Sequence, residues 1–214
     1  MLMQANFRPG EQRTFTEQAR RAQIIEAAVE VIAEVGSAGA SFAKIAKQAG
    51  LSSTGLITYH FANRQDLINS VVGEVMAAFA GHVGPLVDAQ PTPADALDAF
   101  VGANVGFIRS HRKHLLAVLD IAAGSRATEN GAAASAAVAR ADLDALEDLL
   151  ARGQRQGQFR QFDPRSVAIA IRSLRDGILG ALTVDPGLDL DAYGKELRTL
   201  VRLMTAVHTP GEAP

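Results

Sequence analysis

Residues 41–67 have the sequence SFAKIAKQAGLSSTGLITYHFANRQDL, and this stretch decides the fold. Its apolar spacing and its capping residues predict two short helices, Ser41–Ala49 and Ser53–His60, separated by a tight turn. Gly50 suits the left-handed backbone that such a turn needs, and Ala46 is small enough for the two helices to cross closely. This arrangement is a helix-turn-helix, in which the second helix lies in the major groove of DNA.

The charge of this segment supports contact with nucleic acid. No acidic residue occurs from Ser37 to Asn63, whereas Lys44 and Lys47 lie within the segment and Arg64 follows it. Four more cations lie before the first helix or at its start: Arg8, Arg13, Arg20 and Arg21. Such cations suit contacts with phosphates, which supply affinity and register rather than sequence choice. The alternative is a pair of core-packing helices with ordinary surface lysines.

The same stretch resembles the DNA-binding signature of the TetR family of bacterial transcriptional regulators. The resemblance extends from about Arg20 to Val72 and rests on Ile45-Ala46, Ala49-Gly50, His60-Phe61 and Asn63-Arg64 with Leu67. It implies contact with phosphates or bases for seven residues: Lys44, Ser53, Thr54, Gly55, Thr58, Tyr59 and Arg64. It also implies that His60 and Phe61 pack the second helix against its neighbours.

Two departures from the family pattern leave two registers open for the second helix. The interval from Gly50 to Phe61 is one residue longer than in the family, and Thr58 stands where the family has tyrosine, with Tyr59 beside it.

Length and composition limit the class of protein. The chain has 214 residues, 48% of them hydrophobic, a formal net charge of −2 and no cysteine. The lack of cysteine excludes a disulfide framework, thiolate metal sites and cysteine nucleophiles. We find no apolar run near the roughly 18 residues of a membrane span, and Met1–Arg13 has no apolar signal core. We therefore expect a cytoplasmic protein whose positive charge is local.

Apolar residues recur at helical spacing along the whole chain and predict an all-α protein of about nine helices. The helix before the motif is expected to stop at Gly36. The helix after it is expected to start at Asn63 and to break at Gly81, Gly84 and Pro85. These boundaries divide the chain into a DNA-binding domain (14–62), a connecting helix (63–82) and a ligand-binding and dimerisation domain (83–208).

The TetR resemblance implies that the larger domain senses a ligand and dimerises. Two helices near the C-terminus have broad apolar faces that could pair across a two-fold axis. The interface residues that we expect are Leu174, Ile178, Leu182, Leu197, Val201 and Met204. The alternative is that these residues face only the core of their own subunit.

Candidate ligand contacts come from two helices. Phe100, Asn104 and Phe107 share one side of a helix, and Asn104 is a polar group among apolar neighbours. Arg175 and Asp176 interrupt an otherwise apolar helix in a similar way. The alternatives are a solvent-facing Asn104 and an ordinary ion pair at the surface or an interface.

No other chemistry is expected. His111 and His114 lie three residues apart, but no carboxylate at a supporting spacing completes a metal site. The sequence has no phosphate-binding glycine loop and no nucleophile motif, so we expect no cofactor, no metal and no enzymatic activity.

We therefore expect a homodimeric repressor that a small, largely apolar ligand releases from a near-palindromic DNA operator. One alternative is a regulator without a small-molecule ligand, which answers to a protein partner or acts constitutively. The other is a helical carrier of small molecules, in which the helix-turn-helix is incidental.

Overall fold

The computed structural model describes residues 15–125 and 129–207, and this part of the chain is helical throughout, with no strand. Its helices are α1 (Phe15–Gly39), α2 (Phe42–Gln48), α3 (Gly55–His60), α4 (Arg64–Asp88), α5 (Pro93–Ser110), α6 (Arg112–Ser125), α7 (Glu129–Arg155), α8 (Pro164–Val184) and α9 (Leu190–Thr205). The prediction of an all-α protein with about nine helices is confirmed. Arg8 and Arg13 lie outside the described residues.

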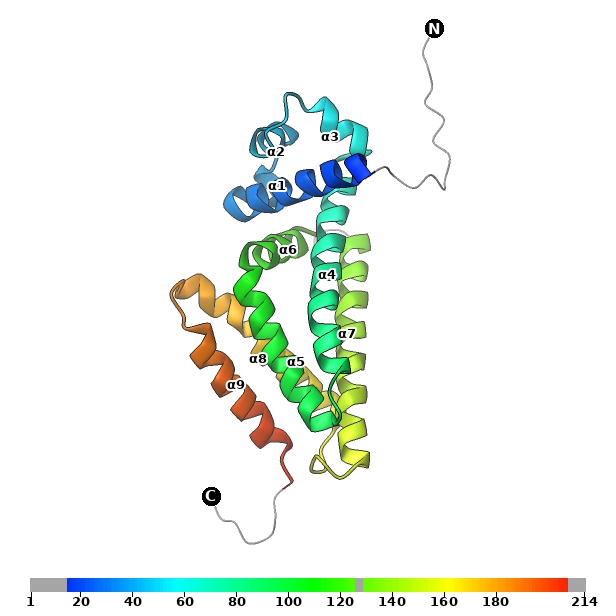
Figure 1. Cartoon of the computed structure of the whole chain (residues 1–214), viewed down its shortest axis with the longest axis vertical. Coiled ribbons are helices and arrows are strands. Elements are labelled where there is room, and N and C mark those ends of the chain that lie inside the picture. The colour runs from blue at the N-terminus through cyan, green and yellow to red at the C-terminus, as the bar shows by residue number, and fades with distance from the viewer. Residues whose placement is uncertain (1–14, 126–128, 208–214) are drawn as a thin grey trace, which may run out of the picture.

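The helices form two groups along the length of the molecule (Figure 1). α1, α2 and α3 lie together at one end, and α5, α8 and α9 lie at the other. α4 runs from the first group alongside α5, and α6 lies between the groups, against α1. The main contacts between the two groups therefore run through α4 and α6.

Two apolar cores correspond to these groups, and α6 belongs to the first. The first core joins α1, α2 and α3 to the beginning of α4, and Ala117 and Ile121 of α6 are buried in it. The second core joins α5, α7, α8 and α9. The division of the chain at residues 62 and 82 remains our proposal. The packing adds that α6, although it follows α5 in sequence, shares a core with the helix-turn-helix.

Gly36 marks the end of the regular part of α1, as predicted. Its φ of +74° and ψ of +159° interrupt the helix, and one more turn follows as far as Gly39. A side chain at Gly36 would be strained, because few residues other than glycine adopt such a positive φ.

α4 is longer than the sequence predicts. It continues to Asp88 through Gly81, Gly84 and Pro85, which were expected to break it. Each glycine costs a helix about 1 kcal/mol relative to alanine, and proline costs more. Tertiary packing outweighs this cost, because Val83 is buried and the ring of Phe79 packs edge-to-face on Phe107 at a centroid distance of 5.3 Å.

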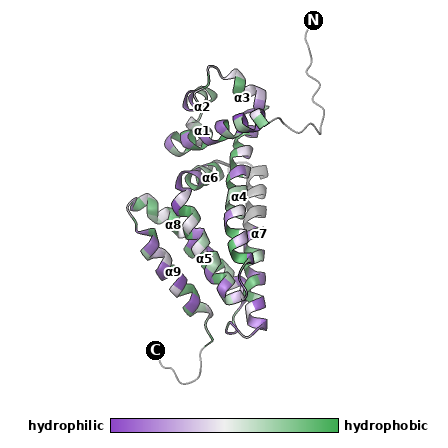
Figure 2. Cartoon of the chain, in the orientation of Figure 1, coloured by the Kyte–Doolittle hydropathy of each residue, from purple (hydrophilic) through white to green (hydrophobic). Residues whose placement is uncertain are grey.

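α4 is also apolar along much of its length (Figure 2). Among the described helices it alone is long and apolar enough to cross a membrane, by length and composition. The sequence-based expectation that no apolar run approaches the length of a membrane span is therefore wrong for α4. Leu67 and Val71 of α4 are fully buried in the first core, which accounts for the apolar character of its first turns.

Candidate nucleic-acid interface

The turn between α2 and α3 has the geometry that its sequence predicts. Ser41 caps α2, since its Oγ accepts a hydrogen bond from the backbone N–H of Lys44 at 3.3 Å. Gly50 has a φ of +63°, and the N–H of Leu51 donates to the carbonyl of Ala46 at 2.8 Å, which closes the end of α2. This is the Schellman pattern of a helix end, and it turns the chain sharply towards α3.

α3 begins two residues later than predicted. The expected start was Ser53, but the helix comprises Gly55–His60, and Thr54 occupies its N-cap position. Thr54 has helical dihedral angles rather than the extended ones of a typical cap, and its side chain makes no capping hydrogen bond. The Thr54 hydroxyl therefore remains at the exposed N-terminal end of α3, where it is available to a partner.

All seven residues expected to touch DNA are exposed. Ile57 and Phe61 are buried beneath α3 and hold it on the first core. Tyr59 is 71% exposed, and its hydroxyl donates a hydrogen bond to Oε1 of Glu17 on α1 at 3.2 Å. The hydroxyl of Thr58 donates to the carbonyl of Gly55, within α3. The exposed side chains of α3 and its N-terminal end are thus uncharged and mostly short and polar, apart from the tyrosine ring and Leu56, which is 37% exposed.

Arg21 has a structural role that the count of positive charges did not reveal. Its guanidinium donates to the carbonyl of His60 at 3.0 Å and to Oγ of Ser70 at 2.5 Å. The same group lies over the ring of Phe61, 4.2 Å from its centroid. The expectation that Arg21 serves phosphate contacts is therefore corrected: it ties α1 to the end of α3 and to α4. Only the fold reveals this, because the three partners are 39 to 49 residues away.

Lys44 and Arg64 are exposed, yet both also contact the end of α1. Nζ of Lys44 donates to the carbonyl of Gly39 at 3.1 Å. Nε of Arg64 donates to the carbonyl of Ala40 at 3.4 Å, and its Nη2 donates to the carbonyl of Ser37. Cations suit these positions, since the last carbonyls of a helix carry partial negative charge. Each side chain can hold the backbone and still present further donors to a phosphate.

Most of the residues expected to form the dimer interface lie in the core of the protomer. Ile178, Leu182, Leu197 and Val201 are buried in the second core, and Leu174 and Met204 are partly buried against it. The first four cannot touch a second copy without unpacking the protomer, so that prediction is wrong for them. The outward faces of α8 and α9 carry a second apolar set instead: Ile169, Val184, Leu200 and Leu203. Val207 is exposed just beyond the end of α9.

Three of the five expected ligand contacts come together. Phe100, Asn104 and Arg175 line an apolar space between α5, α8 and α9, which is closed and leaves no room for a water molecule. Asn104 is only 2% exposed, and its Nδ2 donates to the carbonyl of Phe100 at 2.7 Å. The alternative of a solvent-facing Asn104 is thereby excluded.

The other two expected contacts lie elsewhere. Phe107 is fully buried but does not line that space, and its ring stacks on His111 at a centroid distance of 4.1 Å. Asp176 is half-exposed and forms ion pairs with Arg172 and Arg175. Phe107 lies on nearly the same side of α5 as Phe100, but two turns, or about 10 Å, further along the helix axis, which places it beyond that space.

The charge of Arg175 is stable although its side chain is largely buried. Burial alone lowers the pKa of the guanidinium, but the bonds that Asp142 accepts, with the charges of Asp142 and Asp176, raise it overall. Asp142 accepts from Nη1 at 3.2 Å and from Nη2 at 2.8 Å. A permanently charged group thus lies at the edge of the closed apolar space.

Comparison with known proteins gives matches to the helix-turn-helix segment and to most of the chain. Residues 24–71 match the family model of bacterial regulatory proteins, tetR family. A similar protein is the HTH-type transcriptional regulator BetI of Stenotrophomonas maltophilia, 37% identical over 89 residues, which cover 41% of this chain and 45% of BetI. The fatty acid metabolism regulator protein of Bacillus subtilis is 26% identical over 185 residues, covering 86% of this chain and 90% of that protein.

A solved structure shares the fold of most of the chain. The crystal structure of AibR in complex with isovaleryl coenzyme A and operator DNA superposes with a TM-score of 0.73 at 21% identity, covering 85% of this chain and 97% of that one. The chain spans less than half the length of the BetI regulator that it matches. The similar proteins are regulators and not enzymes, which agrees with the prediction of no enzymatic activity.

Proposed function

Because the chain belongs to the TetR family of bacterial regulatory proteins, we propose that it is a homodimeric repressor of transcription. In this proposal two copies bind a near-palindromic operator in the cytoplasm, and a small, largely apolar ligand releases them. One observation carries the proposal: the N-terminal end of α3 is exposed and polar, in a segment without acidic residues from Ser37 to Asn63.

In the proposed complex, α3 enters the major groove with its N-terminal end towards the bases. Ser53, Thr54 and Gly55 are short enough for the backbone to approach the DNA closely. Lys44 and Arg64 flank them and contact phosphates. These contacts give register and affinity, whereas Thr54, Thr58 and Tyr59 supply the preference for sequence.

The dimer forms through the outward faces of α8 and α9. Leu203 is 60% exposed and Val184 is 88% exposed, although both are large and apolar. Between Ile169 and Val184 the exposed side of α8 carries the small residues Ser173, Gly177 and Gly180, which let a second helix approach closely. Asp176 lies on the same side, and its carboxylate pairs with Arg172 and Arg175 within the protomer. Paired across a two-fold axis, these faces give a four-helix bundle. The two copies of α3 then lie about 34–36 Å apart, or a multiple of this, to match successive grooves.

The effector binds in the space bordered by Phe100, Asn104 and Arg175. Apolar walls with a few polar groups are typical of small-molecule sites. The space is closed in this conformation, so a ligand that enters must separate α5 from α8 and α9 and favours a different arrangement of the helices. It shifts the population only by its difference in affinity for the two states. Acyl compounds are the first class to test, since AibR is seen with isovaleryl coenzyme A and the Bacillus subtilis relative regulates fatty acid metabolism.

Fluorescence anisotropy with labelled DNA from upstream of the chain's own gene tests the DNA contacts, at two salt concentrations and against a scrambled duplex. Lys44→Ala should weaken binding to both duplexes alike and reduce the salt slope by about one. Thr54→Ala should mainly reduce the preference for the specific duplex. The absence of binding at either salt concentration contradicts the proposal and favours the helical carrier.

Sedimentation equilibrium tests the dimer. Leu203→Arg places a charge in the proposed interface and should shift the protein to monomers while its helical content is retained. Leu119→Arg is the matched control, because Leu119 is 45% exposed on α6, away from that face. A Leu203→Arg protein that remains dimeric contradicts this interface.

Melting temperature distinguishes a ligand-responsive repressor from a regulator without a small-molecule ligand. Isovaleryl coenzyme A and longer acyl-coenzyme A esters are added to the full chain, and a ligand that binds only the folded state raises the melting temperature. An effector should also lower the affinity for DNA in the anisotropy assay. If no compound does either, the regulator without a small-molecule ligand is favoured.

A further inference from the structure

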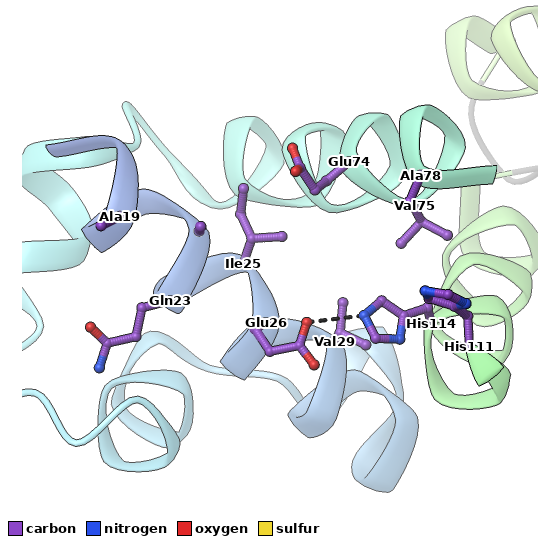
Figure 3. Close-up of a pocket in the computed structure, with 11 residues that line it drawn as sticks. Ala19, Gln23, Ile25, Glu26, Val29, Glu74, Val75, Ala78, His111 and His114 are labelled. Atoms are coloured by element: carbon purple, nitrogen blue, oxygen red, sulfur yellow. Dashed lines mark hydrogen bonds and ion pairs between the residues drawn. The ribbon is translucent and has the colours of Figure 1, made fainter. Parts of the chain in front are cut away.

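A second hollow lies where the two groups of helices meet, apart from the closed space in the second core. It has a volume of about 500 Å³ and is bordered by α1, α4 and the beginning of α6. Its walls are largely apolar and include Ile25, Val29 and Val75 (Figure 3). Hollows of about 300–1,000 Å³ with such walls are typical of sites for small molecules.

The polar groups at this hollow are acids and imidazoles. Glu26 of α1 and Glu74 of α4 border it, together with His114 of α6 and His111, which lies between α5 and α6 (Figure 3). No lysine or arginine is among the residues that line it. Two carboxylates without a fixed cation favour a positively charged ligand and oppose an anion. A metal ion fits less well, because no group of three metal-binding side chains occurs among the described residues.

The two carboxylates differ in their partners. Glu26 accepts from Nε2 of His114 at 3.0 Å, which joins α1 to α6 across the hollow. Glu74 is exposed and forms no hydrogen bond or ion pair with the residues that the structure describes. Glu74 is thus a free anion beside an apolar wall, and it can receive a cation without the loss of an existing bond.

The hollow is also in contact with a group of aromatic rings between α4 and α5. His111, which forms part of its wall, stacks on the buried ring of Phe107, and Phe107 packs on Phe79 of α4. The rings of His111 and His114 meet edge-to-face at 5.5 Å. A ligand against these imidazoles therefore touches α1 of the DNA-binding end and the same aromatic group that packs α4 against α5.

We propose that this hollow binds a small organic cation, namely a protonated amine on a compact apolar body. The ammonium group lies between Glu26 and Glu74, and the apolar body lies against Ile25, Val29 and Val75. A ligand in this position joins α1 to α4 and α6. It holds the junction between the two ends of the molecule in the arrangement described above, independently of any effector in the second core.

NMR of the histidine rings tests the site directly. The chain has five histidines, of which His111 and His114 border the hollow. The full chain is titrated with 4-phenylbutylamine at pH 8, where imidazole is ordinarily neutral and the amine is protonated. The ring signals are assigned with His111→Gln and His114→Gln. Both signals should shift saturably with the amine, whereas the signal of His60, on α3, should not.

Two further compounds with the same phenyl ring and chain length distinguish binding by charge from binding by hydrophobic contact alone. 4-Phenylbutanol is neutral and 4-phenylbutyrate is an anion, so both should bind more weakly than the amine. The amine should also raise the melting temperature at concentrations at which the other two do not. Equal binding of the alcohol and the amine overturns the proposal, since it reduces the hollow to an apolar surface.

Substitutions locate the charge. Glu74→Gln should weaken binding of the amine by about fivefold, the effect of one charge pair at a partly exposed site. Glu34→Gln is the matched control, because it removes a carboxylate from α1 outside the hollow and should leave the affinity unchanged. Glu26→Gln provides a second test of the site. If neither Glu26→Gln nor Glu74→Gln weakens binding, or if Glu34→Gln weakens it equally, the proposed cation site is wrong.

Discussion

The two ends of the molecule use charged side chains in different ways. In the end formed by α1, α2 and α3, the cations Arg21, Lys44 and Arg64 donate to backbone carbonyls. In the other end several cations pair with acids of a neighbouring helix, as Arg175 does with Asp142 and Arg165 with Asp144. Arg112 is an exception, because it donates to the carbonyls of Leu182 and Pro186. A bond to a carbonyl fixes the position of a helix end, whereas a bond between two long side chains tolerates a shift of the helices.

The helices of the two ends also differ in which sides they bury and expose. α3 buries one side and exposes a mostly polar one, in which Leu56 is the apolar exception. α8 and α9 bury one apolar side and expose another, which includes Val184 and Leu203. We infer that the first end is built to present one fixed surface, and that the second is built to accept partners and to change shape.

The prediction with the largest expected effect tests which of the two apolar faces of α8 packs in the core of the protomer. Leu182 is buried in the second core, so Leu182→Ala should lower the free energy of unfolding by about 2–5 kcal/mol. Leu119→Ala, at an exposed leucine of α6, should cost less than about 1 kcal/mol. Urea unfolding at several protein concentrations measures both. If Leu182→Ala instead leaves the monomer stable and only dissociates the dimer, Leu182 is an interface residue after all.

The turn before α3 and the apolar faces of α8 and α9 differ in how far the sequence predicts them. The turn of the helix-turn-helix was predictable because Gly50 and Ser41 act through local backbone geometry, which depends on few neighbours. The burial of Leu182 and Val201 was not, since an apolar stripe fits the protomer core and a subunit interface equally well. The apolar residues on the opposite sides of α8 and α9 carried the missing signal, because one core cannot cover both sides of a helix at once.

The candidate site was predictable to the extent that it depends on short segments. The spacing from Lys44 to Tyr59 was enough to place those residues on an exposed surface. The partners of Arg21 and the convergence of Asn104 with Arg175 depend on contacts between distant segments, which no local pattern encodes. For the same reason no pattern in the sequence predicted the hollow beside Glu74.

A second prediction concerns the bonds that fix α3. Arg21→Met keeps an apolar side chain over Phe61 but removes the hydrogen bonds to His60 and Ser70. It should lower stability by about 2 kcal/mol and weaken DNA binding at every sequence, because the end of α3 is no longer held. Arg20→Met is the control, since the bond of Arg20 to the nearby Gln23 is exposed, and it should cost less than about 0.5 kcal/mol. Equal losses for the two variants would contradict the structural role of Arg21.

A third prediction separates the two roles of Arg64. Arg64→Ala should lower stability by about 1 kcal/mol, because the carbonyls of Ser37 and Ala40 lose a donor. It should also reduce the salt slope of DNA binding by about one. Arg64→Lys retains a charge but cannot reproduce the forked geometry, so it should restore the slope without restoring the stability. An unchanged slope in Arg64→Ala would show that Arg64 only holds α1.

The prediction with the smallest expected effect compares, at low pH, one helix N-cap from each end of the molecule. Asn63 caps α4 and Asp163 caps α8, each through a side-chain oxygen that accepts a backbone N–H. Asn63 cannot titrate. The pKa of Asp163 is lowered, first by the hydrogen bond from the Ser166 side chain and then by that from its backbone N–H, while slight burial opposes this. The carboxylate therefore stabilises the folded state above the ordinary pKa of aspartate, and this stabilisation is lost as the pH falls through the lowered value.

Asp163→Ala and Asn63→Ala should therefore respond differently to pH. The loss of melting temperature caused by Asp163→Ala should be constant from pH 7 down to about pH 4 and should shrink below it. The loss caused by Asn63→Ala should stay the same over this range, because an amide accepts the same hydrogen bond whether or not the solution is acidic. Melting curves of both variants and the unmodified chain between pH 7 and pH 2.5 measure the two differences. If the Asp163→Ala difference also stays constant, the carboxylate contributes only as a hydrogen-bond acceptor, and its charge at the start of α8 has no role.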